Sequence, residues 1–398
     1  MSLFPPVLKP ASRLARYRAL SPLAGIHVSP LQLGAMSIGD KWEPFGFGSM
    51  DRQSSFRLLD AFYEAGGNFI DTANAYQDQT SEQFIGEWAE QRGIRDQLVI
   101  ATKYSTNYVR GDDSIKQKVH YTGNCLKSMH ISVEASLKKL RTSYIDILYV
   151  HWWDFDTSVA EVMNGLHTLV QQGKVLYLGI SDTPAWIVAK ANQYAQDHGK
   201  SPFVIYQGAW NVMAREFERD ILPMCRSEGL ALAPFNVLAA GKLRTDAEEE
   251  RRRQTGEKGR TARAPEWERN ATEKAMSAAL EKVAKEVGTE HITAVAIAYV
   301  MQKAPYALSI TLTPDHIKYL ESMVPLDLGF PHTLGNATTD YNYLMKSAAF
   351  FERQPQPQPM APSADRTDTE SDNMVPILYL MSENVEGVLD IPASQIIV

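Results

Sequence analysis

The sequence is poor in cysteine and has no long apolar run. Its 398 residues include only Cys125 and Cys225, which are too few for a disulfide framework and supply no thiolate metal site. No apolar run approaches the ~18 residues that a membrane-spanning helix needs. We therefore expect a protein without a metal centre or a membrane segment, kept in a reducing compartment such as the cytoplasm.

The chain also lacks an excess of positive charge. With 40 Lys and Arg residues against 47 Asp and Glu residues, the formal net charge is −7, so no broad basic surface is expected to bind nucleic acid. Near the N-terminus, no acidic residue precedes Asp40, which is a balance typical of a transit peptide. Because prolines interrupt any helix there, namely Pro5, Pro6, Pro10 and Pro22, the cytoplasm remains the expected location.

Short apolar segments alternate with helix-period segments between residues 31 and 235. The expected strands are 31–35, 68–70, 98–101, 145–150, 175–180, 203–206 and 230–234, and the helical patterns between them are 52–65, 81–91, 123–140, 159–171, 185–195 and 216–227. Strands that alternate with helices predict parallel βα units. Seven such strands favour an α/β fold of the (β/α)₈ TIM-barrel type, although the pattern also permits a doubly wound open sheet.

The regular alternation ends after residue 235. The charged run 246–260 predicts a solvated helix or loop, and helices are expected at 273–287, 292–303 and 314–323, with ALSITL (307–312) as a candidate strand. Segment 353–373 has too few apolar groups to order and predicts a disordered linker. The expected organisation is thus an N-terminal extension (1–30), a barrel (31–350), the linker (353–373) and a C-terminal tail (374–398).

Polar side chains end three successive predicted strands. Asp71, Lys103 and His151 stand at these ends, and Tyr76 follows Asp71 closely. Alone, each has an ordinary structural interpretation as a turn, core or rim residue. In a barrel, however, the carboxyl ends of neighbouring strands meet at one face, where active sites lie, so we expect the four side chains to share a pocket.

These four groups form a coherent proton donor and oxyanion site. An ammonium beside a phenol favours the phenolate, so we expect Lys103 to lower the pKa of Tyr76. Asp71 would keep Lys103 charged, and His151 would donate a hydrogen bond to a carbonyl oxygen. Nothing in the set can attack a carbonyl carbon. The missing nucleophile therefore has to come from a cofactor, with hydride as the natural candidate.

Several motifs resemble the aldo-keto reductase superfamily. They are DTANAY, ATKY, DILYVHWWD and GISDTPAW, while LGAMSIGD and QGAWNVMAREFERDI resemble its fungal aryl-alcohol dehydrogenase and norsolorinic acid reductase branch. The resemblance covers about 17–303 and returns at LTPDHIKYLESMVPLDLGFP. It implies NADPH-dependent reduction of an aromatic or polycyclic ketone or aldehyde in fungal secondary metabolism. We infer no obligate protein partner.

The resemblance also implies residue roles. Tyr76 would be the proton donor, completed by Asp71, Lys103 and His151, and NADPH would lie across the barrel mouth. The residues implied to bind the cofactor are Asp71, then Ser181, Asp182 and Gln207 at the carboxamide end, Phe235 against the nicotinamide, and Asn236, Val237, Leu238, Ala239, Ala240, Gly241, Lys242, Leu243 and Arg244 along the pyrophosphate. Independently of the resemblance, Trp152 and Trp153 could line an apolar substrate pocket with His151, although large aromatic residues also pack structurally.

One region departs from this family. There, the helix corresponding to 292–303 is followed by an eighth strand and by a turn and helix that grip the 2′-phosphate, whereas here AYVMQKAPY runs almost directly into ALSITLTPDH. The eighth strand and helix are thus truncated or replaced. Because an unclosed barrel exposes strand edges, we expect ALSITL or VPILYLM of the tail to substitute; an open barrel and a gene-model error are the alternatives. The rival function is a non-catalytic barrel, a binding or regulatory subunit with weakened cofactor binding.

Overall fold

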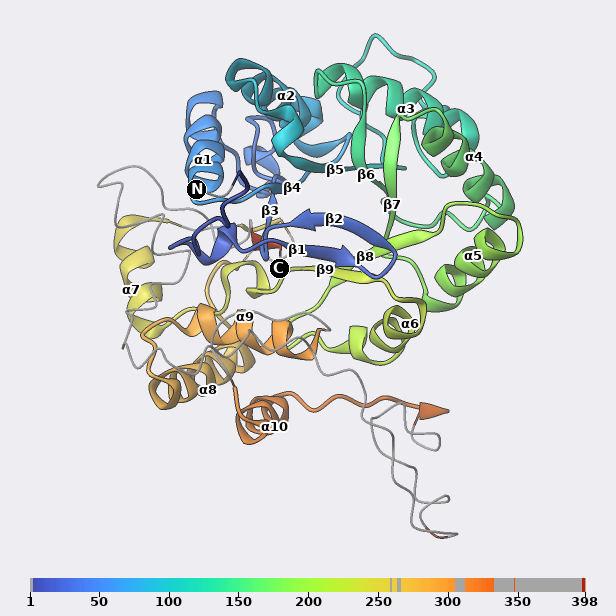
Figure 1. The fold of residues 1–398 in the computed structure, drawn as a ribbon. Coiled ribbons are helices and arrows are strands. Elements are labelled where there is room, and N and C mark those ends of the chain that lie inside the picture. The colour runs from blue at the N-terminus through green and yellow to red at the C-terminus, as the bar shows by residue number, and fades with distance from the viewer. Residues whose placement is uncertain are drawn as a thin grey trace.

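The computed structural model describes residues 3–257, 260–262, 266–304, 312–332, 347 and 396–397 of the protein. Seven parallel strands follow one another in chain order around a barrel, with helices on the outside (Figure 1). The strands are β3 (Gln32–Gly34), β4 (Phe69–Asp71), β5 (Val99–Tyr104), β6 (Ile145–Val150), β7 (Val175–Ser181), β8 (Phe203–Ala209) and β9 (Ala231–Phe235). The predicted α/β barrel is confirmed, and each predicted strand overlaps its observed counterpart.

The outer helices also overlap the predicted segments. They are α1 (Arg52–Glu64), α2 (Thr80–Arg92), α3 (Leu126–Lys139), α4 (Val159–Gln171), α5 (Ala185–Asp197), α6 (Ile221–Glu228), α7 (Asp246–Thr255), α8 (Ala271–Val287), α9 (Ile292–Lys303) and α10 (Pro314–Met323). Side-chain caps define several starts, as where Asp51 accepts the Ser54 amide at 2.7 Å. Among the described residues, no helix has the length and apolar character required to cross a membrane.

Burial explains why the central strands read as continuous apolar runs. Every residue of β5 and β6 is buried, as expected for parallel strands that pack inside the barrel on one face and against helices on the other. One apolar cluster fills the space between strands and helices, and a second fills the barrel interior. The parallel arrangement brings the carboxyl ends of all seven strands to one face, where the predicted site residues lie.

The N-terminal region contributes a hairpin that the sequence analysis did not anticipate. Strands β1 (Arg18–Ser21) and β2 (Ala24–Val28) pair antiparallel in a separate two-stranded sheet and lie across the barrel (Figure 1). Leu20 and Val28 of this hairpin join the apolar cluster of the barrel interior. The predicted extension is therefore partly folded, and it covers apolar side chains at the amino ends of the strands.

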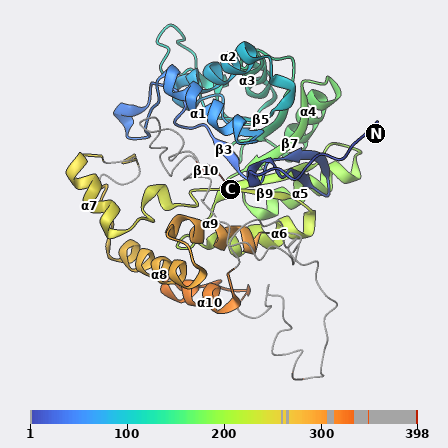
Figure 2. The same ribbon diagram turned by 60° about the vertical axis from the view of Figure 1, so that its left-hand side comes forward.

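A short C-terminal strand lies on the free edge of β3. Strand β10 (Ile396–Ile397) pairs antiparallel with β3, with Ile396 opposite Leu33 and Ile397 opposite Gln32, and it also approaches β9 (Figure 2). The strand on this edge therefore comes from the last residues of the chain. Most of ALSITL, the segment VPILYLM and the predicted linker 353–373 lie outside the described residues.

Deleting residues 396–398 should destabilise the barrel. The deletion uncovers backbone donors and acceptors of β3, and each lost hydrogen bond is worth about 1 kcal/mol. We expect the Tm to fall by about 2 °C or more in differential scanning calorimetry. Deletion of Val398 alone is the control, since it leaves β10 in place. Equal Tm values for the full chain and the longer deletion would show that β10 contributes nothing.

Gly86→Ala should destabilise the contact between α2 and α3. A Cβ at Gly86 would lie 2.6 Å from Leu140 Cα and close to the carbonyl oxygen of Lys139, both backbone atoms that cannot rotate away. We expect the free energy of unfolding to fall by about 2 kcal/mol in a urea titration. Gly25→Ala is the matched control because a Cβ there has no atom of the described residues within 4 Å. Similar stabilities for the two variants would contradict this packing.

Candidate active site

A buried ion pair lies at the centre of the site. Asp71 ends β4 and Lys103 lies near the end of β5, and neither side chain is exposed. Lys103 Nζ donates to Asp71 Oδ2 at 2.5 Å and to the carbonyl oxygen of Thr72 at 2.7 Å. From β8, Gln207 Nε2 donates to Asp71 Oδ1 at 3.0 Å. Three strand ends are thereby joined through one carboxylate.

Tyr76 and His151 complete the group that the sequence predicts. Lys103 Nζ lies 4.9 Å from the centre of the Tyr76 ring, and the Tyr76 and His151 rings meet edge to face with their centres 5.8 Å apart. Both residues are half-buried at the barrel mouth. The structure therefore brings all four predicted side chains into one site.

Burial sets the charge states of this group. It raises the pKa of Tyr76 above its ordinary value, and the opposing charge of Lys103 does not outweigh it; the expected lowering of this pKa is therefore wrong. Burial also disfavours the Lys103 ammonium, but Asp71 and Tyr76 raise the pKa of Lys103 overall. Burial and the charge of Lys103 lower the pKa of His151 to about 3. At neutral pH the site thus contains a protonated phenol, an ammonium and a neutral imidazole.

Gln77, which the sequence analysis missed, fixes the loop beside Tyr76. Its fully buried amide oxygen accepts the backbone N–H groups of Lys41 and Trp42 at 3.0 and 2.8 Å, and its Nε2 donates to the carbonyl oxygens of Met36 and Gly48, both at 2.9 Å. Gln77 itself has φ = 51°, a strained conformation often found at functional sites. The only signal in the sequence was its position next to Tyr76.

Trp42 forms an aromatic wall beside Tyr76. The two ring centres are 6.1 Å apart with an interplanar angle of 72°. The indole Nε1 donates to Asp78 Oδ1 at 3.0 Å, and Arg110 donates to both oxygens of the same carboxylate at 2.7 and 2.9 Å. These contacts hold Trp42 at the mouth, although the sequence analysis assigned it no role.

The two tryptophans after His151 lie in different environments. Trp152 is half-buried, and its indole Nε1 donates to Thr106 Oγ1 at 3.1 Å. Trp153 is only 7% exposed and belongs to the apolar core between strands and helices. Packing in that core removes Trp153 from a pocket shared with Trp152 and His151, so we correct the prediction for Trp153.

The residues predicted to hold a nicotinamide lie on neighbouring strand ends. Ser181 ends β7 and pairs with Gln207 of β8, while the Asp182 amide donates to the Gln207 carbonyl oxygen at 3.0 Å. Phe235 ends β9 and packs against the apolar cluster of the barrel interior. Because Gln207 also contacts Asp71, this group adjoins the ion pair. The four residues predicted to contact the nicotinamide therefore lie at the ends of three adjacent strands, beside Asp71.

The segment predicted to follow the pyrophosphate has an unusual backbone. Asn236, Ala239 and Ala240 have φ values of 62°, 49° and 54°, which residues with side chains rarely adopt and which cluster at functional sites. The side chains that are at most 2% exposed are Val237, Leu238 and Leu243. Gly241 lies in the same turn. Backbone groups are consequently the part of this segment that suits contact with a ligand.

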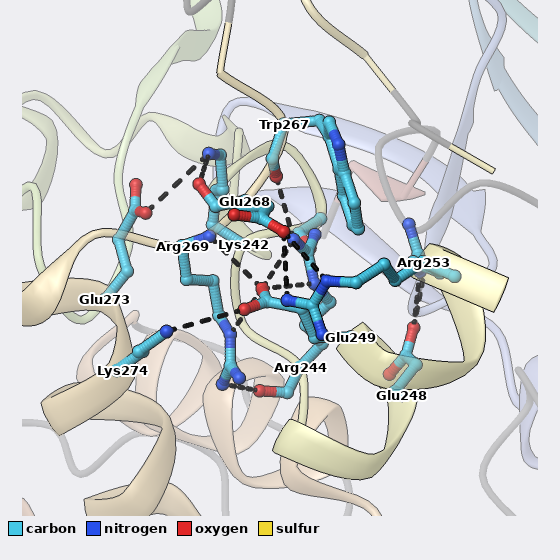
Figure 3. Close-up of polar contacts among 12 residues, drawn as sticks. Lys242, Arg244, Glu248, Glu249, Arg253, Trp267, Glu268, Arg269, Glu273 and Lys274 are labelled. Atoms are coloured by element: carbon cyan, nitrogen blue, oxygen red, sulfur yellow. Dashed lines mark hydrogen bonds and ion pairs between the residues drawn. The ribbon is translucent and has the colours of Figure 1, made fainter. Parts of the chain in front are cut away.

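The two basic residues of this segment bind to the protein itself. Lys242 Nζ donates to the carbonyl oxygens of Glu266 and Glu268 at 2.8 and 2.6 Å. Arg244 is 3% exposed and donates to Glu249 Oε2 at 2.7 Å and to the carbonyl oxygens of Gly241 and Trp267 (Figure 3). Lys242 and Arg244 therefore hold this segment together through contacts within the chain, and their place along a pyrophosphate stays a prediction.

Glu249 lies at the centre of this charged cluster. Its Oε2 accepts from Arg244 at 2.7 Å and from Arg269 Nε at 2.9 Å (Figure 3), although it belongs to the charged run that was expected to be solvated. Glu249 is only 3% exposed. Burial alone would raise the pKa of Glu249, but the hydrogen bonds from Arg269 and Arg244 lower it to about 2. The carboxylate is thus charged at neutral pH and connects α7 to the segment that enters α8.

Comparison with known proteins places the chain in a family. The aldo/keto reductase family model matches residues 30–324. Over 383 residues the chain is 58% identical to an aryl-alcohol dehydrogenase [NADP(+)] of Phanerodontia chrysosporium, with 91% of this chain and 100% of the relative covered. It is 48% identical to norsolorinic acid reductase B of Dothistroma septosporum over 340 residues, or 81% and 85% of the two chains. This chain belongs to the aldo/keto reductase family, a family of oxidoreductases.

Glu249→Gln should lower stability in a pH-dependent way. Loss of the carboxylate leaves Arg244 and Arg269 without their shared charged partner, so we expect a loss of about 3 kcal/mol at pH 7. Because the pKa of Glu249 is lower in the folded than in the unfolded state, its contribution is full above about pH 4.5 and fades as the pH falls toward 2. Urea titrations of both proteins at several pH values should show this difference narrowing below about pH 4.5. A difference independent of pH would contradict the assignment.

Proposed function

We propose that this protein reduces a ketone or aldehyde with NADPH, with Tyr76 as the proton donor. The observation that carries the proposal is the meeting of Tyr76, Lys103, Asp71 and His151 at the carboxyl ends of β4, β5 and β6. This group contains a proton donor and cationic support but no nucleophile, which suits hydride transfer. The family and the relatives reported above support the same class of reaction.

The residues of the chain would perform the proton side of the reaction. A reduced nicotinamide, when bound, supplies a hydride to the carbonyl carbon. Ser181, Asp182 and Gln207 would hold its carboxamide end. His151 donates a hydrogen bond to the carbonyl oxygen, and Tyr76 transfers its proton to that oxygen as the carbon is reduced. The products are an alcohol and a Tyr76 phenolate, which the Lys103 ammonium stabilises until the phenol regains a proton.

The aromatic surroundings support an aromatic or polycyclic substrate. Trp42 stands edge to face with Tyr76, and Trp152 is half-buried beside His151, so flat apolar groups would find aromatic partners on two sides. Relatives named aryl-alcohol dehydrogenase and norsolorinic acid reductase point in the same direction. We place the reaction in the secondary metabolism of a fungus.

The remaining assignments are part of the same proposal. Among the described residues Cys125 and Cys225 are free cysteines, in keeping with a reducing cytoplasm. The barrel unit would extend over 31–350, after the N-terminal region 1–30, and the linker 353–373 would precede the tail 374–398. A small carbonyl compound is the expected partner, without an obligate protein subunit.

Tyr76→Phe should abolish turnover and preserve cofactor binding. The substitution removes the donated proton but keeps the aromatic ring, so kcat should fall by at least about 10³-fold, while the Kd for NADPH stays within about twofold. Steady-state reduction of an aryl aldehyde and a fluorescence titration with NADPH measure the two quantities. Circular dichroism of the variant checks that the fold is unchanged. Substantial remaining turnover would refute Tyr76 as the donor.

The second candidate function is a non-catalytic barrel that acts as a binding or regulatory subunit. The observation in its favour is that Lys242 and Arg244 are engaged with the chain's own carbonyl and carboxylate groups. Titration of the purified full chain with NADPH separates the two functions. A saturable change in nicotinamide fluorescence supports the reductase, whereas no change up to millimolar NADPH supports the rival.

A further inference from the structure

The site leaves open which nitrogen of His151 carries a proton. Burial and the charge of Lys103 keep this imidazole neutral, with a pKa of about 3. A neutral imidazole has one N–H group, and the other nitrogen can only accept a hydrogen bond. Donation to a carbonyl oxygen therefore depends on the tautomer, which the partner of the opposite nitrogen decides.

The partner of His151 is a hydroxyl whose own bonding is constrained. Thr106 Oγ1 lies 3.2 Å from His151 Nδ1 and accepts from Trp152 Nε1 at 3.1 Å. An indole N–H is only a donor, so Thr106 must accept from Trp152. The single proton of Thr106 then finds an acceptor in His151 Nδ1. With a proton on Nδ1, both His151 and Trp152 would donate to Thr106. The hydroxyl proton of Thr106 would then lose His151 Nδ1 as its acceptor.

We propose that Thr106 is a positioning residue that holds His151 in the Nε2–H tautomer. In this arrangement Trp152 donates to Thr106, and Thr106 donates to His151 Nδ1. The proton then resides on Nε2, the nitrogen on the opposite side of the ring from Thr106. The functional role of this tautomer rests on the proposed carbonyl reduction, in which the Nε2–H group would donate to the substrate oxygen.

The loops that carry these residues are fixed to each other by Asn124. This side chain is fully buried, and its Nδ2 donates to Ser105 Oγ at 2.8 Å and to the carbonyl oxygen of Trp152 at 2.9 Å, while its Oδ1 accepts the Asp154 amide at 2.8 Å. Ser105 has φ = 97°, a strained conformation that the surrounding contacts maintain. Asn124 therefore fixes Ser105, the residue before Thr106, relative to the backbone of Trp152.

Nitrogen NMR tests the tautomer without reference to activity. In full-length protein labelled with ¹⁵N-histidine, loss of a signal pair in His151→Asn identifies His151 among the nine histidines. We expect the Nε2–H form in the unmodified protein and in Thr106→Ser, and a mixture of tautomers in Thr106→Val and in Trp152→Phe. Thr122→Val is the matched control, because the Thr122 hydroxyl donates to the Ser105 carbonyl oxygen and is not bonded to His151. The tautomer of His151 should not change in this variant.

Kinetics then tests the consequence. Thr106→Val should lower kcat for an aryl aldehyde by roughly tenfold to a hundredfold, with an unchanged Kd for NADPH, and Thr106→Ser should restore kcat to within about threefold of the unmodified enzyme. An Nδ1–H form in the unmodified protein, an unchanged tautomer in Thr106→Val, or an equal loss in Thr106→Ser would overturn the proposal. If the tautomer shifts as expected but no protein reduces a carbonyl, the role of Thr106 stands and the proposed function fails.

Discussion

The buried ion pair between Lys103 and Asp71 is the constraint on which the site depends. Neither side chain is exposed, and removing one partner of such a pair leaves an uncompensated charge that typically costs 3–5 kcal/mol. Lys103 also donates to the Thr72 carbonyl oxygen, and Asp71 also accepts from Gln207. Because these groups come from β4, β5 and β8, the pair is satisfied only when the barrel brings those strand ends together. Assembly of the site therefore requires the folded barrel.

The same pair determines what the neighbouring groups can do. Its ammonium disfavours a second positive charge, which is one reason why His151 is neutral. A neutral imidazole must be oriented by a hydrogen bond, and Thr106 provides one. For Tyr76, burial outweighs the ammonium and keeps the phenol protonated. Lys103 thus stabilises Tyr76 most strongly after Tyr76 has lost its proton, when the phenolate and the ammonium carry opposite charges close together.

A second buried charge cluster organises the segment after β9. Glu249 accepts from Arg244 and Arg269, so the segments that lead into α7 and α8 meet at one carboxylate. Arg244 resembles a ligand-binding residue when only its place after the last parallel strand is considered. Its donors are instead directed to Glu249 and to the carbonyl oxygens of Gly241 and Trp267. Because Arg244 donates to the Gly241 carbonyl oxygen, the cluster is joined to the residue that directly follows the strained Ala239 and Ala240.

The sequence by itself determined the order and type of the seven parallel strands and of the helices around them, because the helices carry an apolar period and the strands are short apolar runs whose carboxyl ends can be identified locally. It also gave the four polar residues of the site, since strands in chain order are neighbours in a barrel. Only the tertiary structure decided the clamp made by Gln77, the core position of Trp153, the engagement of Arg244 with Glu249 and the pairing of Ile396–Ile397 with β3. These features depend on side-chain directions and on contacts between distant segments, which no local pattern encodes. The pKa of Tyr76 is raised and not lowered because of burial, which exists only in the folded chain.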